Sequence, residues 1–162
     1  NVKKYIISTE AAQHAMKLTQ MGANVKQVSG KLCYVSFDLG YMTLEYVYNI
    51  NAKGKYFLER IKPYPLPIKA YDNEDDVIDI IEIDVEQFRN AANSSHVSEF
   101  ITISNKLHET IKKFEDLFLY YNVPAEQISL LLKEVDEMND TIMETKANSK
   151  RVYTKKEPDT LK

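Results

Sequence analysis

Residues 97–142 have the sequence VSEFITISNKLHETIKKFEDLFLYYNVPAEQISLLLKEVDEMNDTI, and this stretch says more about the fold than any other. Apolar side chains recur in it at alternating intervals of three and four residues, which is the heptad spacing of packed α-helices. In the first half the repeating positions are Val97, Phe100, Ser104, Leu107, Ile111, Phe114, Phe118 and Tyr121. In the second half they are Ile128, Leu131, Val135, Met138 and Ile142. The spacing predicts two long helices, each with an apolar stripe.

A short turn, Asn122-Val123-Pro124, separates the two stripes. Proline suits the first position of a helix, and a connection this short makes the two helices antiparallel neighbours. We assign residues 93–145 to this helical hairpin. Further apolar residues such as Leu117 and Leu130 make the stripes wider than two helices can bury between themselves. The excess must therefore pack on the rest of the chain or on a second copy.

We hypothesise that the hairpin forms the interface of a homodimer. The residues assigned to this interface are Phe100, Leu107, Ile111, Phe114, Phe118, Leu131, Val135 and Met138. The alternative is a monomer in which the two helices cover a sheet formed by the preceding residues.

We assign residues 1–92 to an α+β sheet domain. After Gly22 the apolar side chains follow the period of two that is typical of strands, and residues 3–8 form a short β-like run. The expected strands are residues 3–8, 24–29, 32–39, 42–50 and 55–62. The prolines at 63, 65 and 67 allow only an edge strand or a connector after them. A helix beginning at Ser8 or Thr9 and ending near Gly22 is expected to cover one face of the sheet. The prediction is an α+β fold: an antiparallel meander of about four to five strands with one N-terminal helix, then the long hairpin.

Tyrosines are concentrated in the sheet region, where seven of the eleven lie between Tyr34 and Tyr71. They could form a stacking platform for single-stranded nucleic acid. Because they do not share one strand parity, we favour the ordinary role of tyrosine on half-buried sheet faces.

The net charge of −3 conceals three regions of different sign. Residues 1–71 carry +6, residues 72–144 carry −13 and residues 145–162 carry +4. We expect residues 146–162 to form a basic, flexible tail. The opposite charges could also attract one another within the fold or across a dimer.

The acidic region begins with a dense run of carboxylates, and those assigned to a partner-binding surface are Asp72, Glu74, Asp75, Asp76, Asp79 and Glu82. Branched apolar residues between them favour a strand over residues 77–83, followed by a short helix from Asp84. A single helix over residues 76–93 is the alternative. The favoured role for the acids is a solvated surface, ahead of a surface for a basic partner. A divalent metal site is least favoured because the spacing matches no calcium loop.

Residues suited to catalysis are few, and we expect neither an enzyme nor a bound cofactor or metal. His108-Glu109 begins a zinc-protease pattern, but Lys112 stands where the second histidine is needed. The single cysteine, Cys33, excludes a disulfide framework and alternates with apolar strand residues. Phosphate-binding and dinucleotide-binding glycine motifs are absent from the sequence.

These observations predict a non-catalytic interaction or regulatory protein acting through the hairpin and an acidic surface. One concrete form is an accessory protein of a phage or mobile element that inhibits a basic nucleic-acid-binding protein. The less favoured alternative is a nucleic-acid-binding module using the basic, tyrosine-rich sheet and the basic tail. No apolar run approaches the length of a membrane span, the first residues do not resemble a signal peptide, and we expect a cytoplasmic protein.

Overall fold

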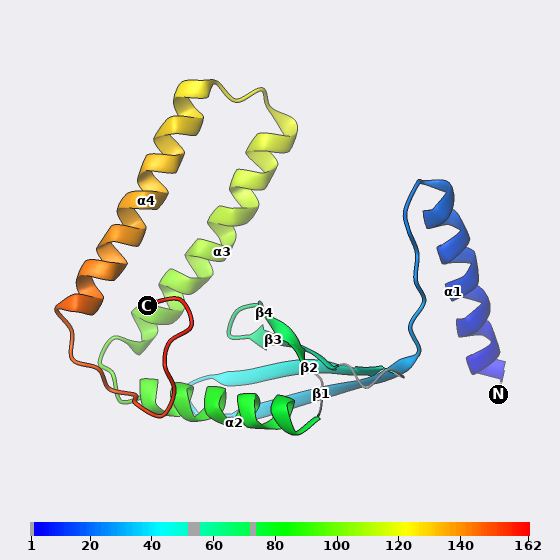
Figure 1. Cartoon of the computed structure of the whole chain (residues 1–162), viewed down its shortest axis with the longest axis horizontal. Helices are drawn as coiled ribbons and strands as arrows, with labels where there is room; N and C mark the ends of the chain where they lie inside the picture. Colours follow the sequence, from blue (N-terminus) through cyan, green and yellow to red (C-terminus); the bar gives the residue numbers. More distant parts are fainter. Residues whose placement is uncertain (1, 52–55, 72–73) are drawn as a thin grey trace.

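The structure is a computed structural model that describes residues 2–51, 56–71 and 74–162. Among these residues, one helix precedes a sheet and three helices follow it (Figure 1). In chain order the elements are α1 (Val2–Gln20), β1 (Gly30–Asp38), β2 (Thr43–Asn51), β3 (Tyr56–Lys62), β4 (Leu66–Tyr71), α2 (Glu74–Ala91), α3 (Val97–Tyr120) and α4 (Ala125–Ala147). The α+β class expected from the sequence is therefore confirmed.

The sheet is an antiparallel meander in the order β1-β2-β3-β4. The strands expected at 32–39, 42–50 and 55–62 correspond to β1, β2 and β3, although residue 55 lies outside the described residues. The proline-containing segment contributes β4, which pairs only with β3 and so lies at the edge of the sheet. Proline is tolerated there because an edge strand need not donate every ladder hydrogen bond.

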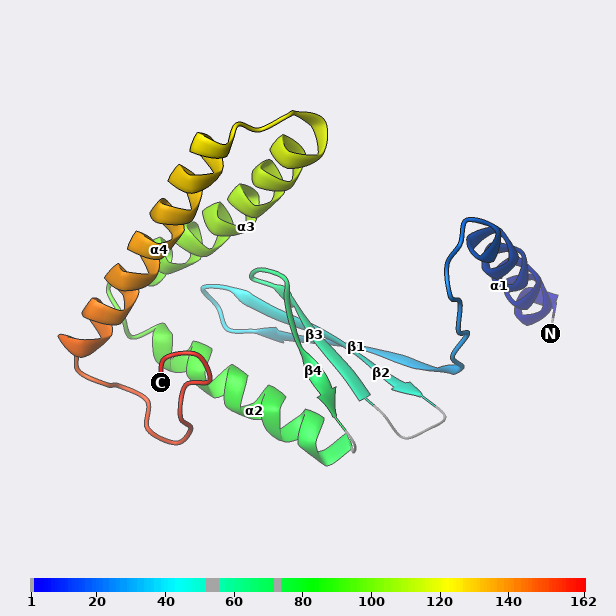
Figure 2. The same ribbon diagram turned by 45° about the horizontal axis from the view of Figure 1, so that its top comes forward.

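The N-terminal region differs from the prediction. Residues 3–8 belong to α1 rather than to a strand, and the hydroxyls of Ser8 and Thr9 donate to the carbonyls four residues earlier instead of capping a helix. α1 ends near the expected Gly22, whose φ is +96°. It covers no face of the sheet, however, because it lies beyond the sheet's end (Figure 2) and none of its residues is buried.

The strand expected at residues 24–29 is also absent, and Gly30 begins β1. Gly30 faces Asn51 across the β1–β2 pair. A Cβ atom at this glycine would lie 2.3 Å from the carbonyl oxygen of Ile50, so this close approach requires glycine.

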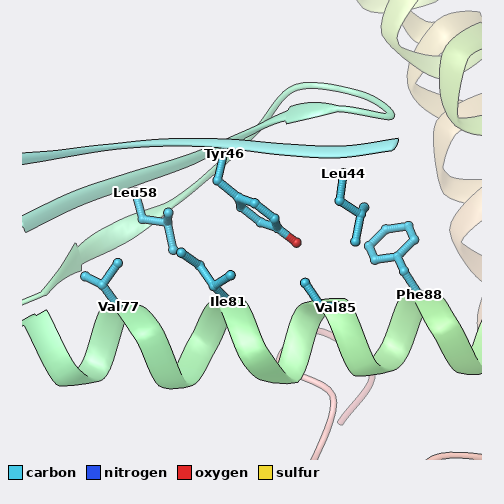
Figure 3. Packing of buried hydrophobic residues seen from close by; sticks show 7 residues of the cluster. All are labelled: Leu44, Tyr46, Leu58, Val77, Ile81, Val85 and Phe88. Carbon is cyan, nitrogen blue, oxygen red and sulfur yellow. The ribbon is translucent and has the colours of Figure 1, made fainter. Parts of the chain in front are cut away.

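α2 packs against one face of the sheet and forms the core with it (Figure 3). The strands contribute Leu44, Tyr46 and Leu58, and the helix contributes Val77, Ile81, Val85 and Phe88. The predicted strand over residues 77–83 is wrong, and the alternative of a single helix is what the structure has. The buried helical residues follow one another at intervals of four, four and three, so burying them on one helix face outweighs the β-propensity of branched residues.

One ion pair is buried at the centre of this packing. Arg60 of β3 is 5% exposed, and its guanidinium donates to both carboxylate oxygens of Asp84 on α2, at 2.8 and 3.0 Å. The hydroxyl of Tyr46 donates to the same carboxylate. The guanidinium also lies over the rings of Tyr64 and Phe88, at 5.2 and 4.8 Å from their centroids. This network joins the sheet to α2 through polar contacts inside an apolar core.

The base of α3 is attached to this core. The ring of Phe100 lies 6.2 Å from those of Tyr64 and Phe88, measured between centroids. His108 lies beside Tyr64, and its Nε2 is 2.8 Å from the carbonyl oxygen of Pro65. Beyond this attachment α3 and α4 extend away from the sheet (Figures 1 and 2), so the alternative in which they cover it is not what the structure has.

Candidate interaction surfaces

The apolar stripes of the hairpin are exposed along both helices. No residue of α3 or α4 is buried. The exposed fractions of Ile111, Phe118 and Val135 are 64%, 59% and 58%. Apolar side chains exposed to this extent on contiguous helical turns make this a candidate surface for binding another molecule.

The two helices of the hairpin do not complete each other's packing. Their backbones do not approach each other closely along their length. Near the turn a hollow of about 500 Å³ separates them, lined among others by Leu117, Leu130 and Leu131. The antiparallel arrangement agrees with the prediction, but the stripes contact each other too little to be buried within one chain.

The structure places the eight residues assigned to a dimer interface in three kinds of environment. Phe100 contacts the core at the base of α3, so part of its surface has an intramolecular partner. Leu131 lines the hollow at the turn. The others are exposed along the helices: Leu107, Ile111, Phe114, Phe118, Val135 and Met138. They form what we call the hairpin surface.

The carboxylates of α2 form a second surface, on the side of the helix that faces away from the sheet. Asp76, Asp79 and Glu82 are exposed. Glu74 and Asp75 lie in the first turn of the helix, whereas Asp72 lies outside the described residues. The expectation of a solvated acidic side of a half-buried element fits the three exposed carboxylates, which we call the acidic surface.

The basic C-terminal segment, residues 148–162, follows α4 and lies against α2. The ammonium of Lys155 pairs with the carboxylate of Glu86, and the hydroxyl of Tyr153 lies 3.5 Å from it. The hydrogen bond and the charge of Glu86 raise the pKa of Lys155. The Asn90 amide donates to the Val152 carbonyl at 3.5 Å. The opposite charges of the two regions thus meet within the fold.

Sequence reasoning missed a cavity between the sheet, α2 and this C-terminal segment. Its volume is about 590 Å³. The residues that line it are Val35, Phe37, Tyr48, Ile78, Ile81, Glu82, Val85, Glu86, Arg89 and Lys155. The alternation of Val35 and Phe37 identified the inward side of β1, but nothing in the sequence indicated that α2 would leave these residues partly uncovered.

The opposite face of the sheet is uncovered and carries two exposed aromatic side chains. Tyr34 and Phe57 are 60% and 54% exposed. Glu45 lies on the same face, where it forms an ion pair of 3.6 Å with Lys62, and it raises the pKa of Tyr34 through a hydrogen bond. Most of the other tyrosines follow the half-buried expectation: Tyr46, Tyr48, Tyr56 and Tyr64 pack in or against the core.

Within the described ranges, no three histidine, cysteine, aspartate or glutamate side chains are grouped so that they could hold a metal ion. None of the helices in the described part of the chain has the length and apolar character needed to cross a membrane. Cys33 is half-buried on β1, and His108 is engaged with Pro65 as described above.

The comparisons with known proteins give no match. No family model matches the chain, and neither a curated protein nor a solved structure does. The function is therefore inferred from the surfaces themselves.

Proposed function

We propose that this chain is a non-catalytic protein-interaction protein of regulatory or accessory type, which acts as a homodimer formed through the hairpin surface. One observation carries the proposal: both long helices expose apolar stripes that no other described part of the chain covers. Helices of this length owe most of their stability to packing of such a stripe. A partner that covers the stripes is therefore expected to be part of the functional state.

A second hairpin is the simplest partner. Two copies related by a two-fold axis present the same surface to each other, so an apolar stripe meets an apolar stripe. The pair of hairpins would form a four-helix bundle, the usual arrangement for helices with heptad stripes. The hollow at the turn leaves space for side chains of the second copy.

The oligomeric state tests this proposal. Ile111→Lys and Val135→Lys place charges on the hairpin surface, at positions already exposed within one chain. We expect sedimentation velocity at micromolar concentration to show a dimer for the wild type and a monomer for both variants, with unchanged circular dichroism. Asn105→Lys and Ser129→Lys, exposed polar positions on the same helices and outside the apolar stripes, are the matched controls and should remain dimeric. A wild type that is monomeric throughout contradicts the proposal.

The acidic surface supports a more specific form of the proposal, in which the dimer binds a basic surface on another protein, such as a nucleic-acid-binding protein. Asp76, Asp79 and Glu82 lie on one side of α2 and are exposed. Clustered charge of one sign speeds association with a surface of the opposite sign and selects against like-charged partners. The basic C-terminal segment would compete for this region because it already contacts Glu86.

An oligolysine peptide is a suitable probe for this form. We expect it to bind the wild type in low salt, and to bind much more weakly when Asp76, Asp79 and Glu82 are all replaced by lysine. The matched control replaces Asp136, Glu137 and Asp140 of α4 by lysine, which changes the net charge by the same amount at exposed positions elsewhere. Equal weakening in both triple variants would mean that net charge, and not the acidic surface, attracts the peptide.

Nucleic-acid binding by the sheet is the second candidate, and the exposure of Tyr34 and Phe57 on its uncovered face favours it. Exposed aromatic rings on a sheet can stack with bases. The carboxylate of Glu45 on the same face argues against nucleic-acid binding, because a negative charge there would repel phosphates. A mobility-shift assay with single- and double-stranded oligonucleotides decides between the two candidates. Salt-sensitive binding that Tyr34→Ala and Phe57→Ala abolish would favour nucleic-acid binding by the sheet.

A further inference from the structure

The cavity under α2 has an apolar interior and a charged rim. Val35, Phe37 and Tyr48 from the sheet and Ile78, Ile81 and Val85 from the helix line its interior. Its volume of about 590 Å³ lies within the range of small-molecule sites, which are mostly apolar with a few polar groups at one end. Glu86 and Arg89 near the C-terminal end of α2, and Lys155 of the C-terminal segment, supply such polar groups at one end of the cavity.

A second cavity adjoins the first and is polar. Its volume is about 420 Å³, and it lies between the last turns of α2 and the C-terminal segment. Asn90, Asn93, Tyr153 and Thr154 contribute to its lining. Amide and hydroxyl groups of these residues can donate hydrogen bonds to a polar ligand.

Three charged residues line both cavities and mark where they meet: Glu86, Arg89 and Lys155. Glu86 and Lys155 pair with each other. Arg89 forms no ion pair with any other described residue. Of the three charged residues, Arg89 and Lys155 are cations and Glu86 is an anion, so the guanidinium of Arg89 is available to bind a ligand. Glu82 lines only the apolar cavity, two helical turns before Arg89.

We propose that the two cavities bind a single-chain amphiphile with a carboxylate head. The hydrocarbon chain would occupy the apolar cavity, and the carboxylate would accept hydrogen bonds from the Arg89 guanidinium, whose planar fork matches carboxylate geometry. The C-terminal segment forms one wall of the polar cavity, so binding of the head group would hold residues 152–155 against α2.

Isothermal titration with dodecanoate below its micelle concentration tests this proposal. Two ligands with the same chain are the comparators, the uncharged dodecanol and the cationic dodecyltrimethylammonium. We expect dodecanoate to bind more tightly than either. Arg89→Gln should weaken dodecanoate about tenfold, which corresponds to one lost charge-assisted hydrogen bond, and should leave dodecanol unchanged.

The location of binding needs its own controls because the hairpin surface is also apolar. Ile78→Trp places a large ring at the half-exposed edge of the apolar cavity and should abolish binding of all three ligands. Ile111→Lys on the hairpin surface should leave dodecanoate binding unchanged. The proposal is overturned if dodecanoate does not bind, if the cationic ligand binds equally well, or if Ile111→Lys abolishes binding while Ile78→Trp does not.

Discussion

Arg60 and Asp84 are joined at two points, with the Nη2–Oδ1 distance at 2.8 Å and the Nε–Oδ2 distance at 3.0 Å. The pair links β3 to α2 where the surrounding side chains are apolar. The carboxylate of Asp84 is turned toward the sheet, whereas Asp76, Asp79 and Glu82 of the same helix form the acidic surface. Because a guanidinium and a carboxylate fit each other in one orientation, the pair also fixes how α2 is rotated on the sheet.

Asp84→Ala should lower the free energy of unfolding by about 3–5 kcal/mol, because it leaves the buried guanidinium of Arg60 without a counter-ion. Arg60 Nη1 already has no hydrogen-bond partner among the described residues. The variant therefore leaves the guanidinium with further unpaired donors and no other partner to replace Asp84. Urea unfolding followed by circular dichroism measures the loss. The double variant that adds Arg60→Met should recover part of it, since no charge is then left buried.

The matched control for this experiment is Asp116→Ala. Asp116 pairs with Lys112 at 2.9 Å, as close as the buried pair, but both side chains are more than half exposed. Its removal should change the free energy of unfolding by about 0.5 kcal/mol or less. Similar losses in Asp84→Ala and Asp116→Ala would contradict the assignment of a special role to the buried pair.

Tyr46 should make the protein sensitive to alkali. Its burial, and the hydrogen bond to the Asp84 carboxylate, raise the pKa of the Tyr46 hydroxyl far above its ordinary value. In the unfolded chain this hydroxyl ionises near pH 10. Above that pH the folded state therefore retains a proton that the unfolded state has lost. The stability contributed by the group is complete below about pH 10 and is lost as the pH rises further.

Tyr46→Phe tests this sign. At pH 7 it should cost about 1 kcal/mol, through the lost hydrogen bond. Above about pH 10 the difference in unfolding free energy from the wild type should narrow, because phenylalanine has no proton to lose. Urea unfolding at several pH values measures both effects, with Tyr121→Phe on the exposed hairpin as the control. A difference that stays constant or grows in alkali contradicts the prediction.

The sequence predicted the two long helices better than it predicted α2, for a physical reason. The stripes of α3 and α4 repeat over many turns, so their helical period is unambiguous. In residues 77–83 five of the seven positions are branched and apolar, which suits a strand and a helix alike. Including Val85 and Phe88 would have favoured the helix, because the spacing from Val77 through Ile81 then continues with the helical period.

The candidate surfaces were predictable only where they depend on local pattern. The hairpin surface follows from the heptads. The pairing of Arg60 with Asp84, and the return of the C-terminal segment to Glu86, join residues far apart in sequence and have no local signal. The two cavities depend on that return, so neither could be predicted from the sequence.

α1 should be the least protected helix in native-state hydrogen exchange. It has no buried residue, and an isolated helix of its length is only marginally stable in water. Its amides should therefore exchange close to the rates of an unfolded peptide, while those of α2 around Val77 and Ile81 should be protected by the full stability of the core. Mass spectrometry of peptides from the two helices makes the comparison within one sample. Strong protection of α1 would show that it packs against another part of the chain or a second copy.

The C-terminal segment should leave α2 in salt without any loss of the core. Its ion pair between Lys155 and Glu86 joins two partly exposed side chains, and pairs of this kind contribute little to stability and are screened by ions. In heteronuclear NOE measurements residues 153–162 should therefore become mobile between low and high salt. Lys155→Ala should reproduce that mobility in low salt, whereas Lys150→Ala, for which no ion pair is recorded in the described part of the chain, should not. If the segment stays ordered in both conditions, apolar contacts and not the ion pair hold it, and a basic partner could not displace it from α2 by charge alone.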